Sequence, residues 1–322
     1  RLVSSMTPTE LTALVKEAGR EAGFSAVGIA SAEPLGEEFD RYMAWLQRGF
    51  NATLGYIDRN HEKRRDPREI LPGTRSVIVV AQNYYTPYTH DHEPGTGKLS
   101  RYSWGDDYHD VIPPKLERLC EVLRQHEPEV ACRYYTDTGP ILEKQWAIRA
   151  GIGWQGKHSN IISRSFGSWF FLGVILTTAE LVPDTPVADF CGSCTACLEA
   201  CPTGAITAPY IVDAGRCISY WTIETKPEVE IPVHIAQNLE GWMFGCDICQ
   251  EVCPWNRFRK PTHEERFLPR HGETSLGFRR IDEFTQEEFS ARFRKSPVKR
   301  TKMAGLKRNA KAVEAGATKA RE

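Results

Sequence analysis

The stretch that decides the fold is CGSCTACLEACP, residues 191–202, in which four cysteines and a proline follow one another at short, regular intervals. It opens a window from Cys191 to Cys253 that holds eight of the ten cysteines of this 322-residue chain. Residues 1–5 lack the apolar core of a signal peptide. Because cytosolic thiols stay reduced, the clustering favours metal or cluster ligation over disulfides. We expect the two other cysteines, Cys120 and Cys132, to be buried structural residues.

The first run, Cys-x2-Cys-x2-Cys-x3-Cys-Pro, has the spacing of bacterial ferredoxins, in which three cysteines bind one [4Fe-4S] cluster and the fourth binds the other. A second run, Cys246 to Pro254, ends in the same way, but Met243 stands where its first cysteine belongs. Cys217 lies between the runs and can fill that place. The crossed pattern then gives one cluster Cys191, Cys194, Cys197 and Cys253, and the other Cys201, Cys217, Cys246 and Cys249.

Two zinc sites with four thiolates each are the alternative to the clusters, since CxxC pairs also suit zinc. Zinc does not need a Cys-Pro ligand that reaches a neighbouring site, so the spacing favours clusters. Two adjacent clusters usually transfer single electrons. The long segment before them exceeds what a simple electron carrier needs, so we expect a catalytic module fed by the clusters, with a non-catalytic two-cluster electron-transfer protein as the alternative.

Composition and pattern divide the chain into three segments. Residues 1–182 alternate apolar runs with helical patterns, which predicts an α/β (α+β) domain. Pro183 and Pro186 mark a boundary, and residues 183–256 form the cysteine segment. Residues 257–322 carry 18 Lys and Arg against 9 Asp and Glu, which predicts a basic, mostly helical tail, although the whole chain has a net charge of only -1.

Individual elements of the first segment can be placed from the pattern. Thr7-Pro-Thr-Glu10 has the form of a capping box with proline at the first helical position, so a helix is expected to follow it. Further helices are expected over residues 37–48, 114–126 and 141–150, and strands over 26–30, 76–81, 130–135 and 169–177. No stretch approaches 18 apolar residues, so we expect a soluble, cytoplasmic protein without a membrane span.

Two motifs allow more than one interpretation. Residues 151–156 spell GxGxxG, but they follow a helical pattern instead of a strand, which favours a helix end at Gly151 and a tight loop over a dinucleotide site. Asp137 lies where a strand gives way to a helix, a common place for catalytic groups. It can equally be a turn residue ahead of a helix that starts at Pro140.

Several longer motifs together carry a family resemblance. The strings SRYSWGDDYHDVI, YTDTGPILEKQWAIRAGIGWQGKHSNII, CPTGAI, CISYWTIE and CDICQEVCPWN, spread over residues 64–256, resemble those of the epoxyqueuosine reductases. The resemblance implies a cobalamin-dependent enzyme with two [4Fe-4S] clusters that reduces epoxyqueuosine to queuosine at the wobble position of tRNA. It also implies a corrinoid-binding fold similar to that of the reductive dehalogenases, followed by a ferredoxin-like two-cluster domain.

The resemblance also implies roles for single residues. Asp137 is the expected proton donor, and the residues expected to contact cobalamin are Arg64, Ser100, Asp137, Ile161, Leu172 and Ser219. His158 departs from the pattern, because some relatives carry Asn at its position. Each cluster passes one electron at a time, so a cofactor that accumulates two electrons suits the removal of an epoxide oxygen.

The tail suits an anionic partner. Residues 289–311 hold nine Lys or Arg and no acidic residue. We expect contacts to the phosphates of a tRNA anticodon stem-loop from Arg292, Arg294, Lys295, Lys299, Arg300 and Lys302. A solvated basic helix is the alternative. A corrinoid reductive dehalogenase or another small-molecule reductase would share the clusters and the cobalt site without needing this tail. We also expect an external electron donor and a monomer.

Overall fold

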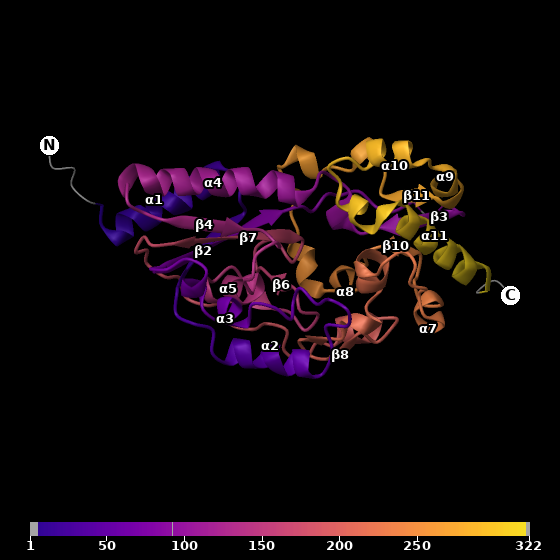
Figure 1. Ribbon diagram of the computed structural model, residues 1–322, viewed down its shortest axis with the longest axis horizontal. Coiled ribbons are helices and arrows are strands. Elements are labelled where there is room, and N and C mark those ends of the chain that lie inside the picture. Colours follow the sequence, from indigo (N-terminus) through magenta and orange to yellow (C-terminus); the bar gives the residue numbers. More distant parts are fainter. Residues whose placement is uncertain (1–5, 92, 320–322) are drawn as a thin grey trace.

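The computed structural model describes residues 6–91 and 93–319. The expectation about residues 1–5 therefore falls outside the described part. Figure 1 shows an elongated molecule, with α1 (Pro8–Glu21), α4 (Tyr108–His126) and the large sheet at one end. The C-terminal helices α9 (Phe278–Glu283), α10 (Gln286–Arg292) and α11 (Lys302–Lys319) lie at the other end. Within the described ranges, no helix is long and apolar enough to span a bilayer.

The large sheet has four strands in the order β1-β2-β7-β4, and each neighbouring pair is antiparallel. The strands are β1 (Ala26–Ser31), β2 (Ser76–Asn83), β7 (Phe170–Thr177) and β4 (Cys132–Tyr135). All four coincide with predicted strands. Because no pair in this sheet is parallel, the domain is the α+β form of the predicted class and not a doubly wound α/β sheet.

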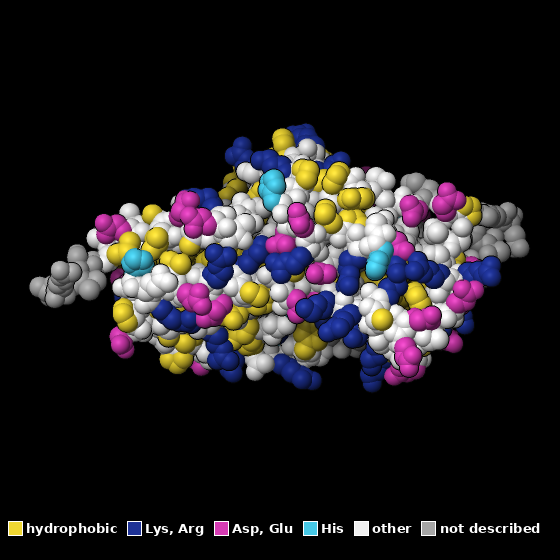
Figure 2. Space-filling view, turned by 90° about the horizontal axis from the view of Figure 1, so that it is seen from above, with side chains coloured by type: hydrophobic (Ala, Val, Ile, Leu, Met, Phe, Trp, Pro, Cys, Tyr) yellow, Lys and Arg dark blue, Asp and Glu magenta, His cyan; other side chains and the backbone are white. Residues whose placement is uncertain are grey.

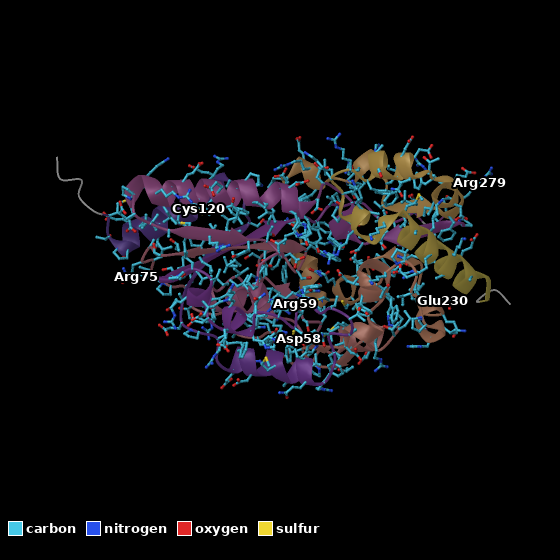
Figure 3. All side chains as sticks on the ribbon, in the orientation of Figure 1. Asp58, Arg59, Arg75, Cys120, Glu230 and Arg279 are labelled. Atoms are coloured by element: carbon cyan, nitrogen blue, oxygen red, sulfur yellow. The ribbon has the colours of Figure 1, made fainter. Side chains whose placement is uncertain are left out.

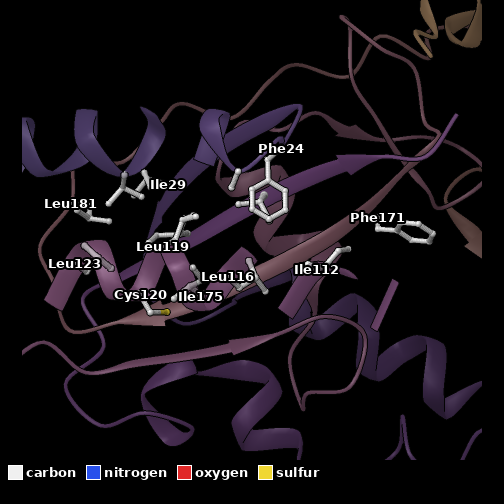
Figure 4. Packing of buried hydrophobic residues seen from close by; sticks show 14 of the residues in the cluster. Phe24, Ile29, Ile112, Leu116, Leu119, Cys120, Leu123, Phe171, Ile175 and Leu181 are labelled. Carbon is white, nitrogen blue, oxygen red and sulfur yellow. The ribbon is translucent and has the colours of Figure 1, made fainter. Parts of the chain in front are cut away.

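Helices cover both faces of the sheet. Along β2, Ile78 and Val80 join the core under α1 and α4, while Val77 and Val79 face α5 (Glu143–Arg149). Figure 4 shows other members of the first core, among them Leu116 of α4 and Ile175 of β7. Every residue of β2 is buried, as expected for a strand covered on both sides. A shift of one residue in its register would exchange the two faces, so this burial fixes how the strands align.

The predicted helices are present, with one correction. α1 has the predicted capping box, with Thr7 and Glu10 each bonded to the other's backbone, and α2 spans Glu37–Gln47. α4 begins at Tyr108, earlier than the predicted start at residue 114. The carboxylate of Asp107 caps the helix by accepting the backbone N–H of His109 (3.0 Å). The helix therefore starts before Pro113 and Pro114, and the predicted start at residue 114 is wrong.

The GxGxxG segment begins with the predicted helix end at Gly151, but it is not a loop throughout, because residues 154 and 155 form a strand. α5 ends before Gly151, whose φ of +69° lies in the left-handed region that favours glycine. A two-stranded hairpin follows, formed by β5 (Trp154–Gln155) and β6 (Ile161–Ile162). A Cβ at Gly153 would lie 2.1 Å from the carbonyl oxygen of Ile162, so close packing requires glycine there.

A second sheet joins the three sequence segments. Its order is β10-β3-β11, built from β3 (Thr96–Leu99), β10 (Trp242–Phe244) and β11 (Ser275–Gly277). With α9, α10 and α11 it encloses a further apolar core. Each predicted segment thus contributes one strand to the same sheet, and the boundaries at 182 and 256 remain predictions drawn from the sequence.

The cysteine segment and its surroundings contain only short elements, as its composition indicates. They are α3 (His61–Arg65), α6 (Ala196–Ala200), β8 (Ile206–Ala208), β9 (Ile211–Val212), α7 (Val233–Ala236) and α8 (Ile248–Glu251). Such a segment has little apolar core of its own and relies on bound groups for stability.

Candidate active site

A cavity of about 850 Å³ lies where the three segments meet. Its walls come from the start of α4, the loop after β4, the β5–β6 hairpin, the cysteine segment and the turn at Pro297–Thr301. The lining combines aliphatic side chains with hydroxyl, carboxylate and ammonium groups. This volume is at the upper end of ligand-binding pockets, so the cavity can take a large, partly apolar molecule.

The eight clustered cysteines divide into two groups with respect to the cavity. We call the four that line it the inner group: Cys201, Cys217, Cys246 and Cys249. The other four, which do not line it, form the outer group: Cys191, Cys194, Cys197 and Cys253. None of the ten cysteines forms a disulfide. The division is the one that the crossed pattern predicts.

Electrostatic interactions among the thiols act mainly within each group, although Cys197 of the outer group also acts on Cys249 of the inner group. Burial and the charges of the other outer cysteines raise the pKa of Cys197 to about 11. Burial, followed by the charges of Cys217 and Cys201, raises the pKa of Cys249 well above its usual range. Thiols of this kind ionise when a bound cation compensates their charge. The donor set fits iron–sulfur ligation, and the assignment of each ligand stays a prediction.

A buried lysine stabilises the loop of the outer group. Lys157, in the β5–β6 hairpin, is 8% exposed, and its ammonium donates to the carbonyl oxygens of Gly192 (2.6 Å) and Cys194 (2.8 Å). Charge-assisted bonds to backbone carbonyls are strong and keep the loop in one conformation. They also place a positive charge beside the outer group, where a cluster with four thiolates would be negative.

Asp137 lines the cavity from the loop after β4. Its φ is +58°, an uncommon value for a residue other than glycine, and two hydrogen bonds hold it there. Its backbone N–H donates to Oε1 of Glu143 (2.7 Å), and its Oδ2 accepts the hydroxyl of Tyr108 (2.7 Å). The ring of Tyr108 stacks on Phe171, with ring centroids 4.2 Å apart. The carboxyl group is therefore positioned, although its side chain is exposed.

The charges near Asp137 affect its two partners. Burial and then the charge of Asp137 raise the pKa of Tyr108, so its hydroxyl stays protonated and donates. Enclosure and then the same charge raise the pKa of Glu143 from 4.5 to about 8. At neutral pH, Glu143 is therefore mostly protonated, and Asp137 is not opposed by a second full negative charge.

Two more polar groups line the cavity beside this loop. Lys144 donates to the carbonyl oxygen of Ser159 (3.0 Å) and to the side chain of Asn160 (3.1 Å). His158 accepts the backbone N–H of Asn160 at Nδ1 (3.2 Å), and among the described residues its Nε2 has no hydrogen-bond partner. Burial and then the charge of Lys144 lower the pKa of His158 to about 4, so the ring is neutral.

The residues predicted to contact cobalamin are only partly brought together. Ser100, Asp137 and Ser219 line the cavity, and the hydroxyl of Ser100 bonds to Asp247. Arg64 is buried, and its guanidinium donates to backbone carbonyls of residues 59 and 56 (3.0 and 2.9 Å). Ile161 and Leu172 pack in the core beside α5 and do not belong to the lining.

Of the six basic residues predicted to bind tRNA, only some line the cavity. Lys295, Lys299 and Arg300 line the cavity, and Arg300 pairs with Glu224 (2.7 Å). Arg292 forms an ion pair with Glu273 and is only 12% exposed, so it is not free to bind a phosphate. Arg294 and Lys302 are exposed but do not line the cavity.

Comparisons with known proteins show the family. Residues 64–138 match the family model described as epoxyqueuosine reductase QueG, DUF1730, and residues 190–256 match that of the 4Fe-4S double cluster binding domain. The epoxyqueuosine reductase of Synechocystis sp. is 48% identical over 277 residues, which are 86% of this chain and 95% of the relative. This chain belongs to the epoxyqueuosine reductase family. It is therefore an oxidoreductase, as the resemblance implied.

Further epoxyqueuosine reductases agree in sequence and in fold. That of Cellulophaga algicola is 44% identical over 92% of this chain and 95% of the relative. A crystal structure of an epoxyqueuosine reductase with an epoxyqueuosine-modified tRNA-Tyr stem loop has a TM-score of 0.89 at 30% identity, over 96% of this chain and 82% of that one. The enzyme from Bacillus subtilis, solved with its catalytic aspartate loop swung out of the active site, has a TM-score of 0.89 at 28% identity, over 98% and 84%.

The comparisons decide between the interpretations of the cysteines. The double-cluster model spans all eight clustered cysteines, so this epoxyqueuosine reductase family member carries two [4Fe-4S] clusters and not two zinc ions. The relatives are named epoxyqueuosine reductases, and this chain matches nearly their whole length. The alternatives of a simple electron carrier and of a dehalogenase are therefore set aside.

Several residues of the site were not assigned from the sequence. Glu143 and Lys144 stand inside the quoted string YTDTGPILEK, and Lys157 inside GWQGKHSN, but charged residues near a helix start normally face solvent. Their roles depend on distances between segments that no spacing rule supplies. A Glu six residues after an Asp in a Gly-Pro turn is the one signal that could have indicated the bond between Asp137 and Glu143.

The assignment of Cys217 to the inner group gives a first prediction. Cys217→Ala removes one of four ligands from one cluster and leaves the outer group intact, so we expect iron content to fall towards half and one cluster spectrum to remain. Iron analysis and low-temperature EPR after anaerobic reconstitution measure this. Cys120→Ala is the control, since Figure 3 shows Cys120 on α4, at the end of the molecule away from Glu230 in the cysteine segment. Wild-type iron content in Cys217→Ala would contradict the assignment.

The raised pKa of Glu143 gives a second prediction. The folded chain keeps a proton on Glu143 up to a pH of about 8, while the unfolded chain releases it near 4.5, so stability falls as pH rises between these values. Glu143→Gln removes the titration and keeps an oxygen for the N–H of Asp137. Between about pH 5.5 and 8.5, the Tm of the wild type should fall more than that of the variant. Equal shifts in wild type, Glu143→Gln and the exposed control Glu287→Gln would refute the argument.

Proposed function

We propose that this chain reduces epoxyqueuosine to queuosine at the wobble position of tRNA, with cobalamin in the cavity and electrons delivered by the two clusters. The observation that carries the proposal is the shared lining: the inner cysteines, Asp137 and three basic side chains of the tail border one cavity. Membership of the epoxyqueuosine reductase family supports the reaction. Two electrons and one proton release the epoxide oxygen as hydroxide and leave a carbon–carbon double bond.

The cavity fits a corrinoid. It holds about 850 Å³, its aliphatic lining includes Ile206, Ile218 and Ile248, and hydroxyl groups of Ser100 and Ser219 border the same space. A macrocycle with apolar faces and amide side chains needs both kinds of surface. When bound, cobalamin supplies a metal centre that accumulates two electrons. In the proposal, Ser100, Asp137 and Ser219 contact it, while Arg64, Ile161 and Leu172 support the walls from behind the lining.

Asp137 suits the role of proton donor because of how it is held. Its Oδ2 accepts the Tyr108 hydroxyl, so a proton carried by the carboxyl group resides on Oδ1. The bond from its backbone N–H to Glu143 fixes the loop at the edge of the cavity. Glu143, with a pKa of about 8 and a bond to the same loop, itself holds a proton beside Asp137 at neutral pH.

The basic lining residues suit an anionic substrate. Lys295, Lys299 and Arg300 border the same cavity as Asp137, so phosphates bound there would bring a nucleotide to the reacting centre. Figure 2 shows Lys and Arg side chains across the middle of one face, with Asp and Glu among them. That face is not uniformly basic. In the proposal, residues therefore bind RNA because they border the cavity and not because the whole face is positively charged. A solved relative is a complex with a modified tRNA stem loop, which supports this partner.

The role of Asp137 is tested by Asp137→Asn, which keeps the shape and the acceptor for Tyr108 but removes the dissociable proton. We expect kcat to fall by about 100-fold or more, while cobalamin and both clusters stay bound. Turnover of an epoxyqueuosine-containing stem-loop and the absorption spectrum measure the two properties. Asp282→Asn, an exposed carboxylate of α9, is the control. Full turnover by Asp137→Asn would show that another group, such as Tyr108, is the proton donor.

The RNA interface is tested by changing Lys295, Lys299 and Arg300 together to Gln. Each lost phosphate contact should lower the slope of log affinity against log salt by about 0.7 to 0.9. KM should rise while kcat at saturating RNA changes little, because such contacts bind the ground state and the transition state equally. The control changes three basic residues in surface ion pairs elsewhere, Arg20, Arg41 and Arg279. An unchanged slope in the variant of Lys295, Lys299 and Arg300 would show that these residues form a solvated basic surface and do not bind phosphates.

A further inference from the structure

An aromatic surface lies beside the outer cysteine group. We define it by Phe190, Val252, Trp255 and Phe258, and the first, second and fourth are 39%, 38% and 39% exposed. Trp255 packs between Phe190 and Phe258, with ring centroids 5.8 and 5.6 Å apart, and its Nε1 donates to the Phe190 carbonyl oxygen (3.3 Å). An exposed group of large apolar side chains on one patch is typical of a binding surface.

The aromatic surface is attached to the outer group by the chain itself. Phe190 precedes Cys191, Val252 precedes Cys253, and Trp255 follows that cysteine by two residues. Within the outer group, Cys194 is exposed. None of the residues that define the aromatic surface lines the cavity, which is bordered by the inner group. The outer group thus meets the protein surface here, and the inner group meets the place of reaction.

Exposed arginines surround the aromatic surface and are held in place by rings. The guanidinium of Arg164 lies 4.9 Å from the ring centroid of Phe190, and that of Arg257 lies 4.6 Å from that of Phe258. Arg259 lies 5.2 Å from the ring centroid of Tyr85. Stacked guanidinium groups keep their charge at a fixed position without being neutralised.

The carboxylates near these arginines do not cancel their charge. Asp189 bonds to the backbone N–H of Cys191 (2.7 Å) and to the hydroxyl of Tyr210, so both of its oxygens are used. Glu251 of α8 is exposed and is a second nearby acid. Counted over Arg164 and residues 189–190 and 251–260, which carry the surface, four basic side chains exceed the two acids.

We propose that the aromatic surface and its arginines form the docking site for the electron donor, a small acidic protein that carries a flavin or an iron–sulfur cofactor. The inference rests on the proposed function, in which the clusters deliver electrons to the cavity. One electron leaves the donor and enters the outer cluster, and no bond forms or breaks. Electron-transfer complexes use small interfaces, so a patch of this size is sufficient. Opposite charges steer such partners together and accelerate the encounter.

The test uses the protein with both clusters, and reduced flavodoxin, an acidic flavin protein, as the probe. Arg164→Glu with Arg257→Glu reverses the charge beside the aromatic surface. At low salt we expect the variant's clusters to be reduced by flavodoxin at least about tenfold more slowly than those of the wild type, with a weaker salt dependence. Stopped-flow absorbance of the clusters measures the rate. Arg279→Glu is the control, because Arg279 is 92% exposed and lies on α9 at one end of the molecule (Figure 3).

Two further measurements separate the possible outcomes. Reduction of the clusters by a small chemical reductant should proceed at the wild-type rate in Arg164→Glu/Arg257→Glu, which shows that the clusters are intact. Affinity for an anticodon stem-loop should also be unchanged. If flavodoxin reduced the clusters of the variant at the wild-type rate, the proposal would be overturned. A loss of RNA affinity as large as the loss in reduction rate would also overturn it and would assign the surface to RNA. Failure of chemically reduced wild type to convert epoxyqueuosine would instead refute the proposed function.

Discussion

Four cysteines from distant points of the chain, Cys201, Cys217, Cys246 and Cys249, share one wall of the cavity, and the rest of the structure is arranged around that wall. Thiolates that bind a cluster must converge from several directions, and the short elements of the cysteine segment cannot hold them alone. The sheet β10-β3-β11 ties this segment to the regions before and after it. Burial favours the neutral form of these thiols, so they ionise only when a bound group compensates the charge of the thiolates.

Another part of the cavity lining depends on the loop that carries Asp137. Asp137 has a left-handed φ, and the two hydrogen bonds from Tyr108 and to Glu143 hold it at the cavity. In the solved structure of the Bacillus subtilis relative, the catalytic aspartate loop is swung out of the active site. In this chain, Glu143 accepts the backbone N–H of Asp137, and its raised pKa keeps it mostly protonated at neutral pH.

Much of this arrangement could be predicted from the sequence because it depends on local spacing. The cysteine intervals, the capping box at Thr7 and the buried run of β2 each fix a structure by themselves. Contacts between distant segments could not be predicted in this way. The ion pair that occupies Arg292 needs Glu273, and the hydrogen bonds that occupy the guanidinium of Arg64 need the carbonyls of the preceding loop.

In the proposed enzyme, the inner cluster and cobalamin occupy neighbouring positions, one in the wall of the cavity and the other within it. Low-temperature EPR of protein loaded with both clusters and with cob(II)alamin measures this directly. We predict that the cobalt signal broadens or splits when the inner cluster is reduced, and that Cys217→Ala abolishes the change while cobalamin remains bound. A cobalt signal identical to that of free cobalamin at every stage of reduction would contradict the account.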